Sequence, residues 1–89
     1  MSDYTDIVDA RSKLLSDIDR LHTTELGVLR IRRNLGLDDD IDAVVRCREI
    51  ILDENSAVER KGKNYYVSSR GGIITVNAGS MTIITAKKI

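Results

Sequence analysis

Apolar residues recur at helical spacing along the first part of the chain. Isoleucine, valine and leucine side chains form a heptad-like stripe between Ile7 and Leu21, which predicts an amphipathic helix over about residues 5–21. A second apolar stripe follows Thr24, which can cap a helix by accepting backbone N–H bonds. This stripe predicts a helix over about residues 24–35, ended by Gly36 in a left-handed conformation.

A third helix is predicted over about residues 39–53. The run Asp38-Asp39-Asp40 precedes it, and carboxylates at a helix start satisfy free N–H groups and the helix dipole. We expect this run to cap the helix rather than bind a metal, because the ligand spacing of a calcium loop is absent. The expected buried stripe is Ile41, Val44, Val45, Ile51 and Leu52.

From Ala57 onward, short runs rich in β-branched residues replace the helical period. The runs 57–60, 64–69, 73–78 and 81–87 are separated by two or three residues of turn type, mostly glycine. This spacing is typical of an antiparallel meander. We therefore predict a single α+β domain over residues 1–89, with three N-terminal helices followed by a three- to four-stranded antiparallel sheet.

The charges divide along the same boundary. Residues 1–56 hold 13 acidic and 8 basic side chains, whereas residues 57–89 hold 6 basic side chains and Glu59 alone. The formal net charge is zero. The division predicts an electrostatically sided molecule whose basic sheet faces an acidic partner. The alternative is that the charges of the two halves only complement each other within the molecule.

The sequence also bears on the cellular location of the protein and on the cofactors it could hold. There is one Cys and one His, so neither an internal disulfide nor a zinc site is predicted, and we expect no cofactor. No apolar run reaches the length of a membrane span, and the acidic N-terminus does not have the order of a signal peptide. We expect a cytoplasmic protein, in a bacterium or an infected host cell, that contacts no membrane.

His22 is the one candidate catalytic residue. It lies at a predicted junction between helices, beside Thr23 and Thr24, and an imidazole titrates near neutral pH. A lone histidine at a turn is also typical of a structural hydrogen bond.

The basic second half holds the predicted binding residues. Cations neutralise phosphates and a tyrosine ring can stack on a base, so we expect an acidic protein surface or a nucleic acid as the partner. The alternatives are that these cations only keep strand edges soluble, and that Arg30 belongs to a solvated helix face. The predicted binding residues are Arg30, Lys61, Lys63, Tyr65, Arg70, Asn77 and Lys87.

Three segments carry a family resemblance that covers about residues 20–88. They begin at His22 (HTTELGVLRI), Arg60 (RKGKNYYV) and Ile74 (ITVNAGSMTIITAKK). The chain resembles a small uncharacterised family of bacteria and their mobile elements, with the motifs HTTELGxxRI, KGKNWYV and ITVNAHSYTIITAHK. It departs from these motifs at Gly79, Met81 and Lys87, where the resemblance implies His, Tyr and His.

The order of helices and meander is also similar to barnase-like and mRNA-cleaving toxin ribonucleases. That likeness, at the level of the fold, implies a base and cationic groups around a scissile phosphate. The positions it selects are His22, Arg30, Lys61, Lys63 and Tyr65.

Three functions follow as expectations. The first is a non-catalytic interaction module, encoded by a phage or mobile element, that inhibits a host defence nucleoprotein complex of the CRISPR type. The second is a toxin-type ribonuclease. The third is a structural homodimer formed through the helix at residues 5–21. The missing motif histidines favour the first over the second.

Overall fold

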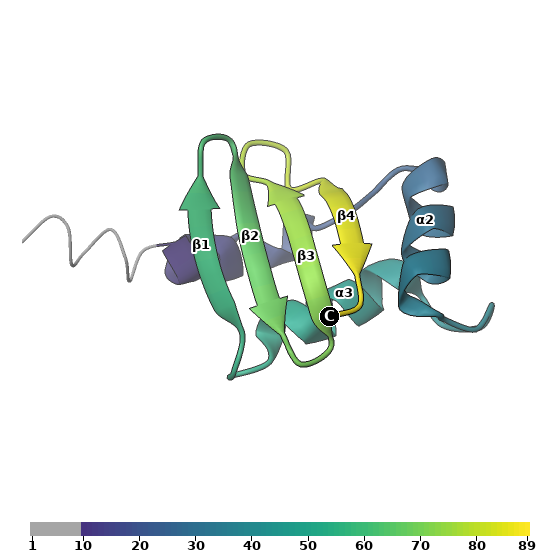
Figure 1. The fold of residues 1–89 in the computed structure, drawn as a ribbon. Coiled ribbons are helices and arrows are strands. Elements are labelled where there is room, and N and C mark those ends of the chain that lie inside the picture. Colours follow the sequence, from purple (N-terminus) through teal and green to yellow (C-terminus); the bar gives the residue numbers. More distant parts are fainter. Residues whose placement is uncertain (1–9) are drawn as a thin grey trace, which may run out of the picture.

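The computed structural model describes residues 10–89, which form a helical layer and a four-stranded sheet (Figure 1). Residues 10–16 are helical and are followed by a short 3-10 helix. The named elements are η1 (Ile18–Arg20), α2 (Glu25–Leu35), α3 (Ala43–Leu52), β1 (Ala57–Lys61), β2 (Asn64–Ser69), β3 (Gly72–Asn77) and β4 (Ile83–Lys87).

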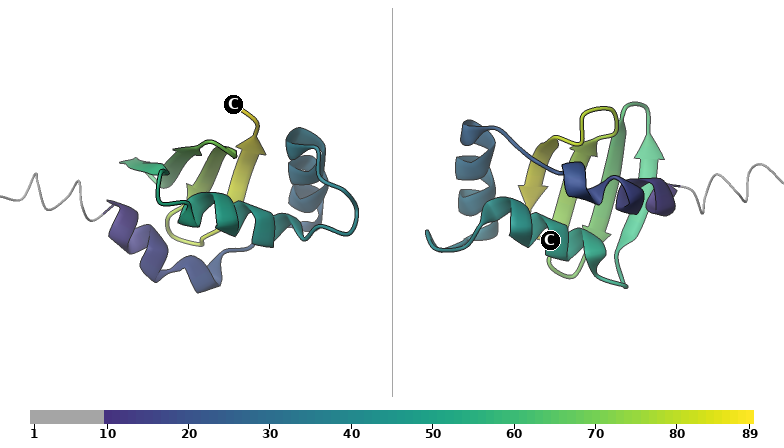
Figure 2. Two further views of the ribbon diagram at one scale, coloured as in Figure 1. Left: turned by 90° about the horizontal axis from the view of Figure 1, so that it is seen from below. Right: turned by 180° about the vertical axis from the view of Figure 1, so that it is seen from behind.

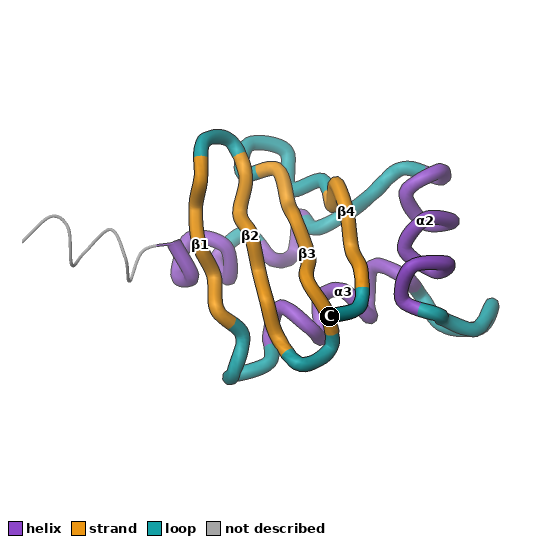
Figure 3. Tube along the Cα trace, viewed as in Figure 1, coloured by secondary structure: helices purple, strands orange, loops and turns teal. Residues whose placement is uncertain are grey.

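The predicted α+β fold is confirmed. The strands pair in the order β1-β2-β3-β4, and every neighbouring pair is antiparallel. Gly62 has a φ of 57°, and this left-handed conformation, which glycine adopts without strain, lets two residues join β1 to β2. The β3–β4 loop lies at the same end of the sheet as this turn, and the β2–β3 turn lies at the other end (Figure 3).

One face of the sheet packs against the helices and holds the core. Residues 10–16 and α3 lie beneath this inner face, and α2 lies beside β4 (Figure 2). The other face, the outer face, is not covered by any helix of residues 10–89 (Figure 2). The inner-face side chains in the core are Tyr65, Val67, Ile74, Val76, Ile83 and Ala86, and the helical layer contributes Leu14, Leu21, Ile31, Leu35, Ala43, Cys47, Ile50 and Ile51.

The second helix has the predicted ends. The Thr24 side chain accepts a hydrogen bond from the Gly27 N–H at 3.0 Å, which satisfies one free donor of the first turn. Gly36 ends the helix with a φ of 66°.

The other two helices are shorter than predicted. The helical segment described from residue 10 ends at residue 16, so the prediction of one helix to residue 21 is wrong there. Residues 5–9 lie outside the described part. The third helix begins at Ala43 rather than near residue 39. Asp42 is its N-cap and accepts bonds from Val44 N and Val45 N, so the preceding aspartates stay outside the helix.

The later start of α3 also corrects its predicted stripe. Ile41, Val45 and Leu52 are exposed, whereas Ala43, Cys47, Ile50 and Ile51 face the core. The described part of the first stripe packs within the chain, since Leu14 is fully buried and Leu21 nearly so. No helix of residues 10–89 is long and apolar enough to cross a membrane.

Candidate functional site

The outer face of the sheet is organised in three cross-strand rows. The alternation of buried and exposed residues along β2 and the register of the four strands define these rows. The first row is Lys61, Asn64 and Asn77; the second is Glu59, Tyr66, Thr75 and Thr85; the third is Ala57, Ser68, Ile73 and Lys87.

Tyr66 is the exposed aromatic ring of this face. It is 38% exposed and lies between Glu59 on β1 and Thr75 on β3, in the second row. Its hydroxyl lies 3.5 Å from Asn64 Nδ2, at the limit of a hydrogen bond. The ring therefore lies among small polar side chains in the interior of the outer face.

Tyr65 is placed differently from the prediction. It points to the inner face and is only 3% exposed, so its ring belongs to the core and not to a binding surface. The Arg60 guanidinium lies 5.4 Å from the Tyr65 ring centroid, in a cation–π contact. Successive strand residues face opposite sides, so one of the two neighbouring tyrosines had to be buried.

The predicted cations are brought to the sheet in two groups. Lys61 and Lys63 lie at the end with the β1–β2 turn, and Arg70 and Lys87 lie at the opposite end. All four are exposed. Arg30 is not part of either group, because it lies on α2 rather than on the sheet.

Glu59 is the only acidic residue from Ala57 onward. Its carboxylate lies 3.7 Å from Lys61 Nζ, with both side chains 67% exposed, so water and salt screen this pair strongly. The outer face is therefore cationic at both ends and close to neutral in the middle.

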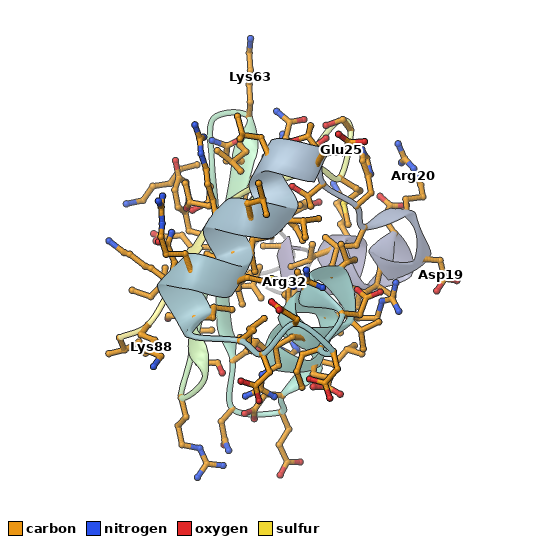
Figure 4. All side chains as sticks on the ribbon, turned by 90° about the vertical axis from the view of Figure 1, so that its right-hand side faces the viewer. Asp19, Arg20, Glu25, Arg32, Lys63 and Lys88 are labelled. Atoms are coloured by element: carbon orange, nitrogen blue, oxygen red, sulfur yellow. The ribbon has the colours of Figure 1, made fainter. Side chains whose placement is uncertain are left out.

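Apart from Glu59, the acidic side chains of residues 10–89 precede β1 in the chain. Lys88 and Asp19 lie on opposite sides of the molecule, and Lys63 extends beyond the end of the sheet (Figure 4). Carboxylates also gather before and along α3, at Asp40, Asp42 and Glu49. Residues 10–56 hold ten acidic and eight basic side chains, so the described helical layer is close to charge balance, and the predicted sidedness rests on the basic sheet.

His22 lies at the end of the sheet that carries the β3–β4 loop. The backbone of His22 bridges to Thr82, with His22 N–H donating to Met81 O at 3.1 Å and Ile83 N–H donating to His22 O at 2.8 Å. This bridge joins residues that are 60 positions apart in the chain. It also places the imidazole against the hydroxyls of Ser80 and Thr82.

The hydrogen bonds of His22 define its tautomer. Nδ1 lies 2.8 Å from Arg20 O, and a carbonyl only accepts, so Nδ1 carries the proton of the neutral ring. Nε2 then accepts from the Thr82 hydroxyl at 3.2 Å, and the Ser80 hydroxyl lies 2.7 Å from that of Thr82. In the neutral ring Nε2 is therefore the nitrogen that faces an exposed chain of hydroxyl groups, and this chain is the second candidate site.

Asn77 organises the loop beside this cluster. Its Oδ1 accepts bonds from Gly79 N and Ser80 N, each at 2.9 Å, so the side-chain oxygen of this predicted binding residue already has partners within the chain. Ala78 N–H donates to Lys63 O at 2.8 Å and ties the two neighbouring turns together. Lys63 and the His22 cluster therefore belong to the same end of the sheet.

Other features of residues 10–89 give weaker evidence of a functional site. A hollow of about 790 Å³ runs along β1 and is open to solvent, with walls from both sides of the strand. Burial raises the pKa of the Cys47 thiol to about 12, which makes it a core residue rather than a nucleophile. Among residues 10–89, no three side chains of metal-binding type converge.

Comparison with protein families places the chain. A family model described as "Protein of unknown function (DUF3781)" matches residues 15–87. The chain belongs to the DUF3781 family. The match spans both the outer sheet face and the His22 cluster, so neither site lies outside the family domain. Comparison with curated proteins and with solved structures gave no match.

Several residues of the two sites were not among the predicted site residues. They include Asn64, Tyr66, Ser68, Thr75, Ser80, Thr82 and Thr85. Strand alternation puts Tyr65 and Tyr66 on opposite faces of the sheet but does not tell which of the two faces the core. The contact of Thr82 with His22 had no local signal in the sequence.

Proposed function

We propose that this DUF3781 protein is a non-catalytic binding module that holds single-stranded nucleic acid on the outer face of its sheet. The observation that carries the proposal is the exposed ring of Tyr66, in the interior of an uncovered face with cations at both ends. Four-stranded sheets with exposed aromatic rings are a recurrent platform on which unpaired bases stack.

The electrostatics support the same partner. A strand running along the outer face would meet Lys61 and Lys63 at one end and Arg70 and Lys87 at the other, where phosphates release counterions. A duplex offers no unpaired base to Tyr66, so single strands are favoured.

The side chains around Tyr66 are suited to weak, sequence-tolerant contacts. Asn64, Ser68 and Thr85 offer amide and hydroxyl groups on the same face. Tyr66 is the single exposed tyrosine ring among residues 10–89, so stacking on the outer face supplies only one strong base contact. We therefore expect dissociation constants on the order of micromolar rather than nanomolar.

The test is a fluorescence-anisotropy titration of labelled single-stranded RNA and DNA at two salt concentrations. With three or four phosphate contacts, the affinity should fall roughly 20- to 50-fold between about 50 and 200 mM salt. Duplex of the same sequence is the control and should bind more weakly. Absence of binding at low salt, or binding insensitive to salt, would overturn the proposal and leave an acidic protein as the partner.

The family resemblance to bacterial mobile-element proteins suggests a setting for such a module. An inhibitor of a CRISPR-type defence complex would occupy the guide or target strand while that strand is unpaired. Adding the protein to a purified effector complex and measuring target cleavage tests this version. Inhibition by wild type that is lost in Tyr66→Ala would support the inhibitor proposal. Unchanged target cleavage in the presence of wild type would contradict it.

The His22 cluster favours a second candidate, a toxin-type ribonuclease. In that reaction the 2′-hydroxyl oxygen attacks the adjacent phosphorus, the unprotonated Nε2 of His22 takes its proton, and the bond to the 5′-oxygen breaks. A protonated group must then supply a proton to the leaving oxygen. The resemblance implies histidines at positions 79 and 87, where this chain has Gly79 and Lys87, so the binding module remains the stronger proposal.

An RNA-cleavage assay separates the two candidates. A ribonuclease that uses His22 would lose cleavage in His22→Ala and keep it in the matched variant Thr24→Ser, which retains the helix cap. Equal cleavage by wild type and His22→Ala, or cleavage by neither, removes His22 from the chemistry.

A further inference from the structure

Glu59 is an exception among the charges of the outer face. It is the only acidic residue from Ala57 onward, and the strand register places it directly opposite Tyr66. A carboxylate on a surface that holds phosphates weakens their binding by like-charge repulsion. Its position beside the exposed ring therefore indicates a role other than contact with phosphate.

The side chains of Glu59 and Tyr66 extend toward the same end of the sheet. The Glu59 carboxylate lies 3.7 Å from Lys61 Nζ, and the Tyr66 hydroxyl lies 3.5 Å from Asn64 Nδ2. Lys61 and Asn64 are themselves paired in the neighbouring cross-strand row. A base stacked on the Tyr66 ring would therefore have a carboxylate, an ammonium group and an amide along one edge.

The Glu59 carboxylate is accessible to such a base. The side chains of Glu59 and Lys61 are both 67% exposed, and their separation of 3.7 Å is longer than a charge-assisted hydrogen bond. A carboxylate also has several acceptor positions, so the contact with Lys61 leaves others free for a ligand.

The carboxylate selects among the bases by their donors, because it only accepts hydrogen bonds. The Watson–Crick edge of guanine carries two neighbouring donors, N1–H and the 2-amino group, which match the two oxygens of one carboxylate. Adenine and cytosine each place an amino group beside an unprotonated ring nitrogen, which repels the second oxygen. Uracil has a single N–H between two carbonyl oxygens. Stacking itself accepts every base, so a preference has to come from the groups beside the ring.

The neighbours of Glu59 complete the same pattern. The third group on this edge of guanine is the carbonyl oxygen O6, which is an acceptor. Lys61 Nζ and Asn64 Nδ2 are donors, and they lie beside the Glu59 carboxylate and the Tyr66 hydroxyl respectively. The three side chains therefore offer a set of acceptors and donors that is complementary to guanine.

We propose that Glu59 reads the base stacked on Tyr66 and selects guanine in an unpaired strand. This inference rests on the proposed function, because it requires a strand on the outer face of the sheet. It adds a base preference at one position of the strand and leaves the other contacts sequence-tolerant.

Fluorescence anisotropy with short labelled uridine strands tests the preference. One strand is all uridine, and the others carry a single central guanine, inosine, adenine or cytosine. A bidentate contact should make the guanine strand bind about fivefold or more tightly than the strand with adenine, the matched purine. Inosine keeps N1–H but lacks the 2-amino group, so its strand should fall between the two.

Glu59→Gln distinguishes base reading from a simple effect of charge. Removing a negative charge alone would tighten the binding of every strand. Loss of base reading instead weakens guanine relative to adenine, so these two affinities should converge to within about twofold. The matched control is Asp39→Asn, which removes a carboxylate from the segment before α3 and should keep the guanine preference. Circular dichroism verifies that both variants are folded.

Two results would overturn the role of Glu59 and leave the binding module in place. The first is salt-sensitive binding with equal affinity for the guanine and adenine strands. The second is a guanine preference that survives in Glu59→Gln. If no strand binds at low salt, both the base reading and the binding module are wrong.

Discussion

Tyr65 and Tyr66 are adjacent in β2 and point to opposite faces of the sheet. The first is 3% exposed and packs in the core, whereas the second is 38% exposed on the outer face. Two rings of the same chemistry therefore have separable roles, one in stability and one in the proposed binding. Substituting each in turn distinguishes the core from the proposed interface.

Tyr66→Ala should weaken binding of single-stranded nucleic acid and leave the fold intact. Removing one base-stacking ring costs about 1–3 kcal/mol of binding free energy, or roughly 5- to 150-fold in affinity. Tyr66→Phe keeps the ring and should bind within a few-fold of wild type. Anisotropy titrations at about 50 mM salt measure this, and equal affinities for wild type and Tyr66→Ala would show that the ring does not contact the ligand.

Tyr65→Ala should instead lower the stability of the fold. Truncating a buried aromatic ring leaves a cavity and costs about 3–5 kcal/mol of unfolding free energy. Urea denaturation measures the loss, and Tyr65→Phe, which keeps the buried ring, should lose much less. A Tyr65→Ala variant as stable as wild type would contradict the placement of this ring in the core.

The cap of α3 gives a prediction at the opposite side of the molecule. Asp42→Ala removes an acceptor for Val44 N and Val45 N and should lower the unfolding free energy by about 1 kcal/mol. Asp42→Asn keeps the side-chain oxygen and should lose little. Asp39→Ala is the matched control outside the helix, and an equal loss in both alanine variants would argue against the cap.

Alkaline pH should destabilise the protein through Cys47. Burial raises the pKa of this thiol from 9.0 to about 12. As pH rises above 9, the unfolded chain releases the thiol proton while the native state retains it, so the unfolding free energy falls until the native thiol also ionises near pH 12. This contribution is fully present below pH 9 and is lost across that window.

The size of the effect can be isolated by substitution. Between pH 9 and pH 10 the thiol should remove about 1 kcal/mol from the stability of wild type. Cys47→Ala lacks this contribution, so urea unfolding of both proteins at the two pH values gives the difference. Parallel pH dependences would mean that the thiol is not buried as described.

The sequence predicted those features of the fold that depend on neighbouring residues. Thr24 and Gly36 mark the ends of α2 because a cap and a left-handed residue act within one turn. The strand runs were found because period-2 alternation is local. The third helix was predicted too long because any of several aspartates was a possible cap, and only the structure selects Asp42.

The candidate sites were harder to predict because they depend on contacts between distant segments. The alternation of Tyr65 and Tyr66 is symmetric in the sequence, and packing on the helices decides which ring is buried. The contact between His22 and Thr82 depends on a bridge across 60 positions. Spacing alone also could not divide the cations between the two ends of the sheet.

A ¹⁵N–¹H correlation NMR titration of the protein with an unlabelled single-stranded oligonucleotide is the most direct test of the proposal that the outer face of the sheet holds a single strand. We expect the largest shift changes at Tyr66, Thr75 and Thr85, with smaller ones at both cationic ends and none on α3. Shift changes centred on the helical layer, or no changes at saturating ligand, would contradict it.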